Sequence, residues 1–271
     1  MRNAHDRVDP APDRIAPGPS PATTKVVVHG VSRVFPRKGE TLEAVVGVDL
    51  AVETGEFVCL LGPSGCGKST LLNIIGGFLE PTSGYVQIDG QVVTGPHPRR
   101  VFVLQEYGIF PWASVWDNVA LGLTKRPKEE RERITRHYVD LVGLKGFEDS
   151  FPSEISGGMQ QRVAVARALA VSPDIVFMDE PLGALDSLTR LQMRREILKI
   201  WRQEKLTILF VTHDVDEALQ LGERIVVMTA RPGTIREIVK VDLPHPRDFG
   251  SLEYGRAKNR LFELLGVSHA V

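Results

Sequence analysis

Cysteine is scarce in this sequence, with only Cys59 and Cys66 among 271 residues. Seven positions apart and without further cysteine partners, they are typical of reduced thiols in a cytosolic protein, not of a disulfide framework or a zinc site. Long apolar runs are also missing, since none approaches the roughly 18 residues that a membrane-spanning helix requires. The N-terminus shows no apolar core of a signal peptide, so we expect a chain that is not secreted.

An excess of charge of one sign is absent as well. The 33 Lys and Arg residues nearly balance the 34 Asp and Glu residues, for a formal net charge of −1. This balance argues against a nucleic-acid-binding protein that relies on a general basic field. What the chain does contain is 42% hydrophobic residues, which is enough for a substantial core.

Residues 1–24 differ from the rest in composition. They carry five of the 18 prolines and almost no large apolar side chains. Such a segment cannot bury enough surface to offset the entropy of ordering, so we expect a disordered tail. A partner-binding arm is the alternative.

Two kinds of strand pattern follow the tail. Alternating, β-branched segments at 25–35, 41–52 and 84–93 predict antiparallel strands with one wet face. Short, continuously apolar segments are typical of strands buried on both faces of a parallel sheet, and they occur at 56–62, 174–180, 206–214 and 224–230.

Helical patterns separate the apolar strands and predict an α/β fold with ligands at the carboxyl ends of its strands. These patterns cover 68–79, 160–171, 188–204 and 214–222. Between about 112 and 165 the buried strands disappear, and an amphipathic helix is predicted over 128–144. We interpret this region as a helical lobe inserted into the α/β core.

The segment "GPSGCGKST" lies between a predicted strand and a predicted helix, and it matches the phosphate-binding pattern G-x-x-x-x-G-K-[ST]. Glycines allow backbone N–H groups to surround phosphate oxygens, Lys68 supplies a positive charge, and Ser69 is suited to bind Mg²⁺. The helix dipole adds to the attraction. A chance glycine-rich turn is the alternative. The expected nucleotide-contacting residues of the loop are Gly62, Pro63, Ser64, Gly65, Cys66, Gly67, Lys68, Ser69 and Thr70.

Two adjacent acids, Asp179 and Glu180, end the predicted strand "DIVFMDE". One acid could hold Mg²⁺ while the other acts as general base on the attacking water. On their own, paired acids at the end of a strand are more often solvated turn residues. A phosphate loop in the same chain favours the catalytic interpretation.

Taken in order along the chain, these motifs resemble the ATPase subunits of ABC transporters, over about residues 25–265. Besides the phosphate loop and the paired acids, the resemblance rests on Gln105 in "VLQEYGIFPW", Ser156–Gly158, "GALD" ending at Asp186, and His213 in "VTHD". It implies a P-loop NTPase with a mainly parallel sheet core, an N-terminal antiparallel β subdomain and an inserted helical subdomain. Residues 266–271 would form a short tail.

The same resemblance gives a role to Ser156, Gly157 and Gly158, which precede a helix-forming run. They would face the γ-phosphate of ATP bound to a second, identical or similar subunit, where small residues let N–H groups approach the anion. This chain has Ile155 and Met159 where the family's motif has leucine and glutamine. Taken alone, the segment would be an ordinary helix cap.

Four further roles are implied by the resemblance, and the first three have a structural alternative. Gln105 would sense Mg²⁺ and the attacking water, or it is a surface glutamine. His213 would contact the γ-phosphate and hold Glu180 and water in place, or it is merely structural. Phe35 would stack on adenine, or it belongs to the core. Asp186 would shape the subunit boundary.

The segment 106–123, "EYGIFPWASVWDNVALGL", is unusually apolar for a loop, so we expect it to be covered. Internal packing of the helical lobe is one possible cover. A cytoplasmic helix of a membrane-protein partner is the other, and the family favours it.

The resemblance extends to the nitrate/sulfonate/taurine group of importers, through "GCGKSTLLNIIGGFLEPTSG", "FPW" and "LPHPRD". It implies ATP and Mg²⁺ as cofactors, a second ATPase subunit, an integral membrane permease and, indirectly, an extracytoplasmic solute-binding protein. The chain would sit peripherally on the cytoplasmic face of the membrane, and no nucleic acid is expected. The solute itself is an analogy, because this subunit would not touch it.

Three rival functions differ in what they require of the sequence. A soluble ABC-type ATPase that acts on DNA or ribosomes typically has two ATPase units in one chain or a long coiled-coil insertion. Neither pattern is found in this sequence. A GTPase switch needs an N-K-x-D motif and leaves Ser156–Gly158 without a role. A non-enzymatic nucleotide-binding regulator is disfavoured by the intact Glu180 and His213.

Overall fold

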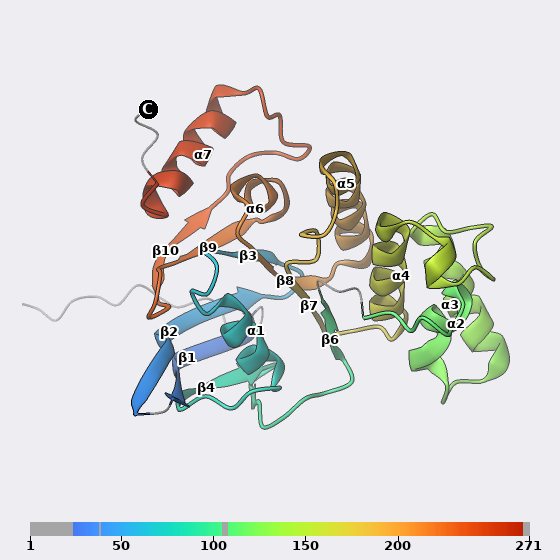
Figure 1. Ribbon diagram of the computed structural model, residues 1–271, viewed down its shortest axis with the longest axis horizontal. Helices are drawn as coiled ribbons and strands as arrows, with labels where there is room; N and C mark the ends of the chain where they lie inside the picture. The colour runs from blue at the N-terminus through green and yellow to red at the C-terminus, as the bar shows by residue number, and fades with distance from the viewer. Residues whose placement is uncertain (1–23, 38, 105–107, 268–271) are drawn as a thin grey trace, which may run out of the picture.

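A computed structural model of the chain describes residues 24–37, 39–104 and 108–267. Two β-sheets lie next to each other, and a group of helices extends to one side of them (Figure 1). Among the described residues, no helix combines the length and the apolar character needed to cross a bilayer.

The smaller sheet is antiparallel and has the order β2-β1-β4-β5. Its strands are β1 (Thr24–Arg37), β2 (Glu40–Glu53), β4 (Ser83–Ile88) and β5 (Gln91–Val92). The sequence predicted this sheet from its alternating apolar and polar residues. Such alternation arises when one face of a sheet packs on the core and the other face is exposed to solvent. The predicted strand at 84–93 is divided into β4 and β5 by a turn at Asp89 and Gly90.

The larger sheet has the order β10-β9-β3-β8-β7-β6, and all its pairs are parallel except β9 with β10. Its strands are β3 (Phe57–Leu61), β6 (Arg100–Val103), β7 (Ile175–Asp179), β8 (Thr207–Thr212), β9 (Arg224–Met228) and β10 (Ile235–Lys240). The four apolar segments of the sequence form its central strands β9, β3, β8 and β7, which confirms the predicted parallel core.

The two faces of the larger sheet belong to two separate hydrophobic cores, because neighbouring residues of a strand point to opposite faces. In β3, Val58 and Leu60 pack with the smaller sheet and helix α1 (Lys68–Gly76). Phe57 and Cys59 pack with the helices of the opposite face. Burial on both faces explains why these strands are continuously apolar.

Several helices cover the second core. They are α4 (Gly157–Ala170), α5 (Ser187–Glu204), α6 (Val215–Leu221) and α7 (Leu252–Leu264). In Figure 1, α5, α6 and α7 lie along the larger sheet, while α2 (Val115–Ala120) and α3 (Lys128–Leu141) lie with α4 at the outer end of the molecule. The short 3₁₀ helices η1 (Leu121–Leu123) and η2 (Pro152–Glu154) complete this helical group.

Some elements were absent from the predictions: β6, β10, α2 and α7. The predicted division into a tail 1–24, a domain 25–265 with a helical lobe at about 112–165, and a tail 266–271 stays a prediction. Strand β1 begins at Thr24, the last residue of the expected N-terminal tail. Residues 1–23 and 268–271 lie outside the described part of the chain.

The architecture brings the predicted motifs to one edge. The phosphate loop follows β3, Asp179 ends β7 with Glu180 directly after it, and His213 follows β8. Because β3, β8 and β7 are adjacent and parallel, their carboxyl ends meet at the same edge of the sheet, where α/β folds bind ligands.

Candidate nucleotide site

The phosphate loop runs from the end of β3 into α1 and is held tightly by its neighbours. Gly67 has a φ of +97°, and a Cβ there would lie 2.5 Å from the carbonyl oxygen of Ala44. Only glycine therefore fits this left-handed, crowded position without displacing the backbone of β2. The backbone N–H of Leu71 donates to the Gly67 carbonyl at 2.8 Å, which begins the hydrogen bonding of α1.

Lys68 is buried at the centre of this loop. Its ammonium group donates to the carbonyl oxygens of Gly62 at 2.8 Å and Pro63 at 3.0 Å. The same nitrogen lies 4.0 Å from Oε1 of Glu180. The loop thus holds one positive charge next to the proposed general base.

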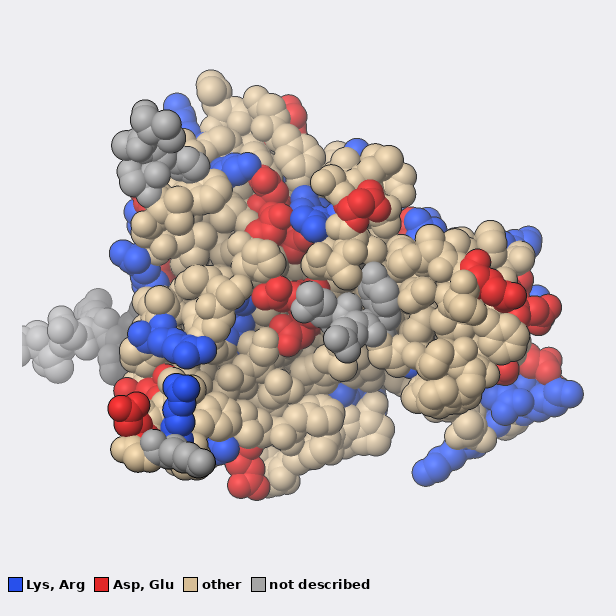
Figure 2. Space-filling view, in the orientation of Figure 1, with Lys and Arg blue, Asp and Glu red and all other residues tan. Residues whose placement is uncertain are grey.

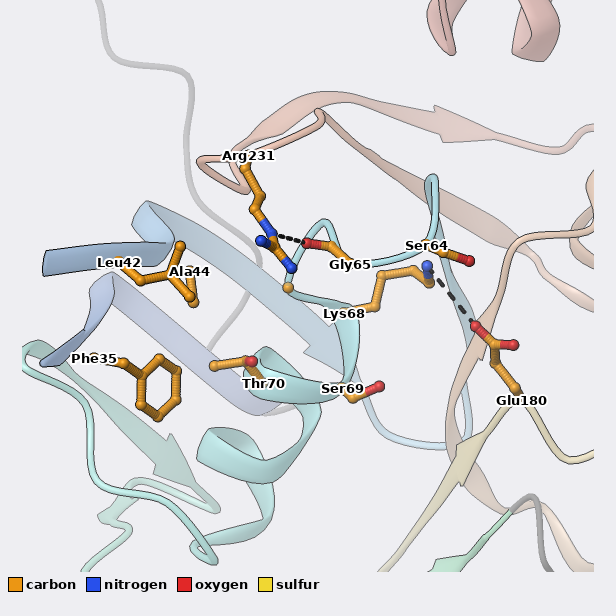
Figure 3. A pocket seen from close by; sticks show the side chains of 11 residues that line it. Phe35, Leu42, Ala44, Ser64, Gly65, Lys68, Ser69, Thr70, Glu180 and Arg231 are labelled. Atoms are coloured by element: carbon orange, nitrogen blue, oxygen red, sulfur yellow. Dashed lines mark hydrogen bonds and ion pairs between the residues drawn. The ribbon is translucent and has the colours of Figure 1, made fainter. Parts of the chain in front are cut away.

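A cavity of about 270 Å³ follows the loop from Phe35 to Glu180 (Figure 3). Its walls are formed by Phe35, Leu42, Ala44, Ser64, Gly65, Gly67, Lys68, Ser69, Thr70, Glu180 and Arg231. An aromatic ring stands at one end, while a lysine and a carboxylate stand at the other. This order suits a nucleotide that is bound with its base near Phe35 and its phosphates near Lys68.

Not every residue of the predicted loop faces this cavity. The thiol of Cys66 is buried beneath the loop, 3.9 Å from Nζ of Lys68, and burial raises its pKa. Gly62 is also buried, and a Cβ there would meet Sγ of Cys66 at 2.8 Å. Pro63 is exposed at the start of the loop.

Ser69 and Asp179 meet across the first turn of α1, where the Ser69 hydroxyl donates to Oδ1 of Asp179 at 3.0 Å. Burial raises the pKa of Asp179. Mg²⁺ prefers one or two protein oxygens together with phosphate oxygens and water. A hydroxyl beside a carboxylate fits that preference, and the described residues contain no cluster of three or more His, Cys, Asp or Glu side chains that would suit another metal.

Glu180 and His213 form a close pair. Oε2 of Glu180 lies 3.0 Å from Nδ1 of His213, and its Oε1 faces Lys68. Glu180 adopts a φ of +45°, and its backbone N–H donates to the carbonyl of Val211 at 3.0 Å. This left-handed conformation is uncommon outside glycine, so the neighbouring strand stabilises the turn that presents the carboxylate.

A buried ionic cluster lies behind this pair. Arg194 is 3.4 Å from Glu217 and 3.5 Å from Asp214, and Glu217 accepts from the Thr212 hydroxyl at 2.6 Å. Glu217 is almost fully buried, and this burial raises its pKa. A water-sized cavity of about 40 Å³ separates the cluster from Glu180, with Glu217 and His213 among its walls.

Asp186 is exposed and serves as the N-cap of α5. Its Oδ1 accepts from the backbone N–H groups of Leu188 and Thr189, both at 3.1 Å. A hydrogen bond from the Thr189 side chain is the main reason why the pKa of Asp186 lies below its ordinary value, and the backbone N–H of Thr189 adds to the effect. The proposed role of Asp186 at a subunit boundary stays a prediction.

Phe35 occupies a position that is compatible with both predicted roles, stacking on adenine and packing in the core. Its ring lines the cavity, and it also packs against the core between the two sheets. The guanidinium of Arg33 lies over the ring, 4.7 Å from its centroid. One half-buried ring thus contacts both the interior and the end of the cavity where a base would lie.

Ser156, Gly157 and Gly158 form the N-terminus of α4 and do not line the cavity that contains Lys68. The Ser156 hydroxyl accepts from the Met159 backbone N–H at 3.3 Å, so the residue is an N-cap. A Cβ on Gly158 would lie 2.6 Å from Cγ2 of Thr189. Ser156 and Gly157 are exposed, so this helix end is accessible to a second molecule.

Gln105 and Tyr107 lie outside the described residues, so the expected role of Gln105 stays a prediction. The apolar segment that follows them is partly packed against the protein and partly exposed to solvent. Ile109 packs against the helical core, whereas Trp112 keeps 75% of its surface exposed. The buried Asn118 accepts from the Phe110 N–H at 2.8 Å and fixes the loop.

Arg231, Leu42 and Ala44 line the cavity but were not predicted from the sequence. Leu42 and Ala44 belong to β2, where they fit an ordinary strand pattern. Arg231 follows the buried strand β9 at the same sheet edge as the motifs. That position is the one signal in the sequence that could have identified it.

Charged side chains of both signs are interspersed over the face of the molecule shown in Figure 2. The view matches the near-neutral composition of the chain. The absence of a nucleic-acid partner stays a prediction.

The fold and the site together define a nucleotide-binding P-loop ATPase. The family model for ABC transporters matches residues 45–183, and the chain belongs to this family. An uncharacterized ABC transporter ATP-binding protein of Methanocaldococcus jannaschii is 49% identical over 89% of this chain and 91% of that protein. The aliphatic sulfonates import ATP-binding protein SsuB of Bacillus cereus is 42% identical over 88% of this chain and 94% of that protein.

Solved structures support the same conclusion. A dimeric, post-hydrolysis ATP-binding cassette bound to ADP and phosphate has a TM-score of 0.70 and 34% identity, covering 80% of this chain and 98% of that one. The cbiO1 protein of Clostridium perfringens, part of a transporter complex, has a TM-score of 0.75 over 90% of this chain and all of its own. Its 23% identity supports the fold alone. The chain is an ATP-binding, ATP-hydrolysing subunit of an ABC transporter.

Proposed function

We propose that the chain powers import of a small anion, such as a sulfonate, taurine or nitrate, through a separate membrane permease. The observation that carries this proposal is the 42% identity to the sulfonate-import subunit SsuB over 94% of that protein's length. Two copies of the chain would bind the cytoplasmic side of the permease, and an extracytoplasmic protein would deliver the solute.

In one copy, the described residues supply most of an ATP site. Phe35 stacks on the base, the phosphate loop binds the phosphates through its N–H groups, and Lys68 neutralises their charge. Ser69 and Asp179 would hold Mg²⁺, which compensates the charge on the β- and γ-phosphates. Gln105 would complete this shell.

Hydrolysis would depend on the pair formed by Glu180 and His213. Glu180 takes a proton from the attacking water as the water oxygen bonds to the γ-phosphorus and the bond to the β–γ bridging oxygen breaks. His213 holds the carboxylate through Nδ1, and Nε2 is the ring atom that would face the γ-phosphate, as an N–H donor when the ring carries both protons. ADP and phosphate are then released.

The second copy would complete the site. Its Ser156, Gly157 and Gly158 would bring the N-terminus of α4 to the γ-phosphate, where exposed N–H groups and the helix dipole favour an anion. ATP would join the two copies and hydrolysis would release them. The exposed Trp112 and its loop are candidates for contact with the permease.

The test of the transport proposal is a reconstituted importer. The chain, its permease and its solute-binding protein are placed in vesicles, and ATP hydrolysis is measured with an alkanesulfonate, taurine, nitrate or a sugar. We expect one of the anions, and not the sugar, to stimulate hydrolysis and to accumulate with the binding protein. Stimulation by the sugar alone, or co-purification with ribosomes or nucleic acid in place of a permease, would contradict the proposal.

A further inference from the structure

We infer that Arg231 is a phosphate-contacting residue of the ATP site and binds the nucleotide near its β-phosphate. The inference rests on the proposed ATP site and adds a second cation to Lys68. Arg231 lies in the turn between β9 and β10, which are far in the sequence from the phosphate loop, yet its side chain lines the same cavity (Figure 3).

The turn that carries Arg231 is held against the site by backbone hydrogen bonds. The N–H of Gly233 donates to Ala44 at 3.1 Å, and the N–H of Val46 donates back to Gly233 at 3.0 Å. A Cβ on Gly233 would lie 2.0 Å from the carbonyl oxygen of Cys66, so this glycine permits close contact with the phosphate loop. The turn therefore contacts β2 and the phosphate loop at once.

The Arg231 side chain is oriented by the loop itself. Its Nε donates to the carbonyl oxygen of Gly65 at 2.8 Å, and Nη2 would be 3.0 Å from a Cβ at that glycine. In Figure 3 the guanidinium points from the β9–β10 turn directly toward the loop. One hydrogen bond uses one of the five N–H groups of the guanidinium.

The remaining N–H groups belong to an exposed, permanently charged side chain on the cavity wall. Guanidinium groups bind phosphate oxygens through planar, charge-assisted hydrogen bonds. Because Gly65 fixes the guanidinium, less side-chain entropy is lost when phosphate binds. Gly65 belongs to the part of the loop whose N–H groups surround the inner phosphates, which places the expected contact at the β-phosphate.

The test measures the affinity of the full chain for ATP, ADP and AMP in the presence of Mg²⁺. Wild type is compared with four variants, which are Arg231→Met, Arg231→Lys, Arg236→Met and Lys68→Ala. Arg231→Met should weaken ATP and ADP about tenfold and AMP less than twofold, because AMP lacks the β-phosphate. Arg231→Lys should recover part of the loss, since it keeps the charge but not the planar geometry. Arg236→Met is the matched control, because Arg236 is exposed in the adjoining strand β10 and does not line the cavity.

The Lys68→Ala variant distinguishes failure of the Arg231 contact from failure of the proposed ATP site. If Lys68→Ala weakens ATP binding and Arg231→Met leaves it within twofold of wild type, the Arg231 contact is wrong and the site stands. If Lys68→Ala has no effect, the proposed site is itself wrong. An equal loss for AMP, ADP and ATP in Arg231→Met would also overturn the phosphate contact.

A structure of the wild-type chain with ADP gives a direct answer that needs no variant to fold. We expect a guanidinium nitrogen of Arg231 within hydrogen-bonding distance, about 3 Å, of a phosphate oxygen. A guanidinium that stays on Gly65 but lies beyond about 4 Å from every phosphate oxygen would overturn the inference.

Discussion

Nδ1 of His213 lies 3.0 Å from Oε2 of Glu180, at the carboxyl ends of the adjacent strands β8 and β7. An ionised carboxylate only accepts hydrogen bonds, so Nδ1 carries the proton when Glu180 is charged. The contact orients both the carboxylate and the imidazole ring. The order of the strands in the sheet is thus a direct part of the proposed hydrolytic chemistry.

His213→Ala should therefore lower kcat for ATP hydrolysis by about a hundredfold, because Glu180 loses its orienting partner and the γ-phosphate loses a contact. The affinity for ATP should change little, since the phosphate loop remains intact. Steady-state hydrolysis and equilibrium ATP binding provide the two measurements. His97→Ala, which alters an exposed histidine distant in sequence from the motifs, is the control, and equal kcat in both variants would refute the role of His213.

Asp179→Asn should raise the Mg²⁺ concentration required for half-maximal hydrolysis about tenfold, because a charged ligand is replaced by a neutral one. Metal binds the ionised carboxylate, and burial raises the pKa of Asp179. Apparent Mg²⁺ affinity should therefore fall as the pH is lowered through that raised pKa, at a higher pH than for an exposed aspartate. A Mg²⁺ titration at several pH values measures both effects, and an unchanged requirement in the variant would exclude Asp179 as a ligand.

Arg190 joins the loop before α5 to the segment after β8. It donates to the Leu185 carbonyl at 2.9 Å and lies 3.8 Å from Asp214 and 3.7 Å from Glu217. Arg190→Met should lower kcat about tenfold while ATP affinity stays constant, because this residue positions the segment that contains His213.

Arg195→Met is the control for Arg190, since Arg195 is exposed on the same helix. Arg190→Lys should restore part of kcat by keeping the charge. If Arg190→Met and Arg195→Met hydrolyse ATP equally well, the bridge has no influence on the site.

Ser251→Ala tests the anchoring of the C-terminal helix α7. The Ser251 hydroxyl accepts from the Tyr254 N–H at 3.2 Å, and loss of an N-cap costs about 1 kcal/mol. The free energy of unfolding should fall by that amount in urea, with kcat unchanged at low temperature. Ser251→Thr retains a hydroxyl that can accept from the Tyr254 N–H and donate to the Asp248 carbonyl, so it should unfold like wild type; a similar loss in both variants would show that the cap is not the cause.

The parts of the fold predicted from the sequence are those with a strong local pattern. The buried strands around 56–62 and 206–214 are continuously apolar, and the phosphate loop has a spacing that few other structures require. By contrast, β6 contains only four residues, and β10 is a half-exposed antiparallel edge strand. A run of four residues is too short to be distinguished from a loop, and three charged residues interrupt the apolar pattern of β10.

Arg231 shows why part of the site could not be predicted. Its partner Gly65 is 166 positions away in the sequence, and the contact depends on how the β9–β10 turn packs against β2. Local sequence patterns do not indicate contacts between segments that are distant in the sequence. The phosphate loop, Asp179 and Glu180 were found because each lies at or just after the end of a predicted strand, and His213 was implied by the family resemblance. The parallel sheet brings these strand ends together.

The central claim is that Ser156–Gly158 of one copy completes the ATP site of another, and a mass measurement tests it most directly. Glu180→Gln removes the proposed base, which should slow hydrolysis by about 10²–10⁴ while ATP stays bound. With saturating ATP and Mg²⁺, this variant alone should have twice the chain's mass of 29.9 kDa, and with its permease it should be present as two copies per complex. Adding Ser156→Arg should return it to single copies. A Glu180→Gln chain that binds ATP and still remains a single copy, both in solution and on its permease, would contradict the account.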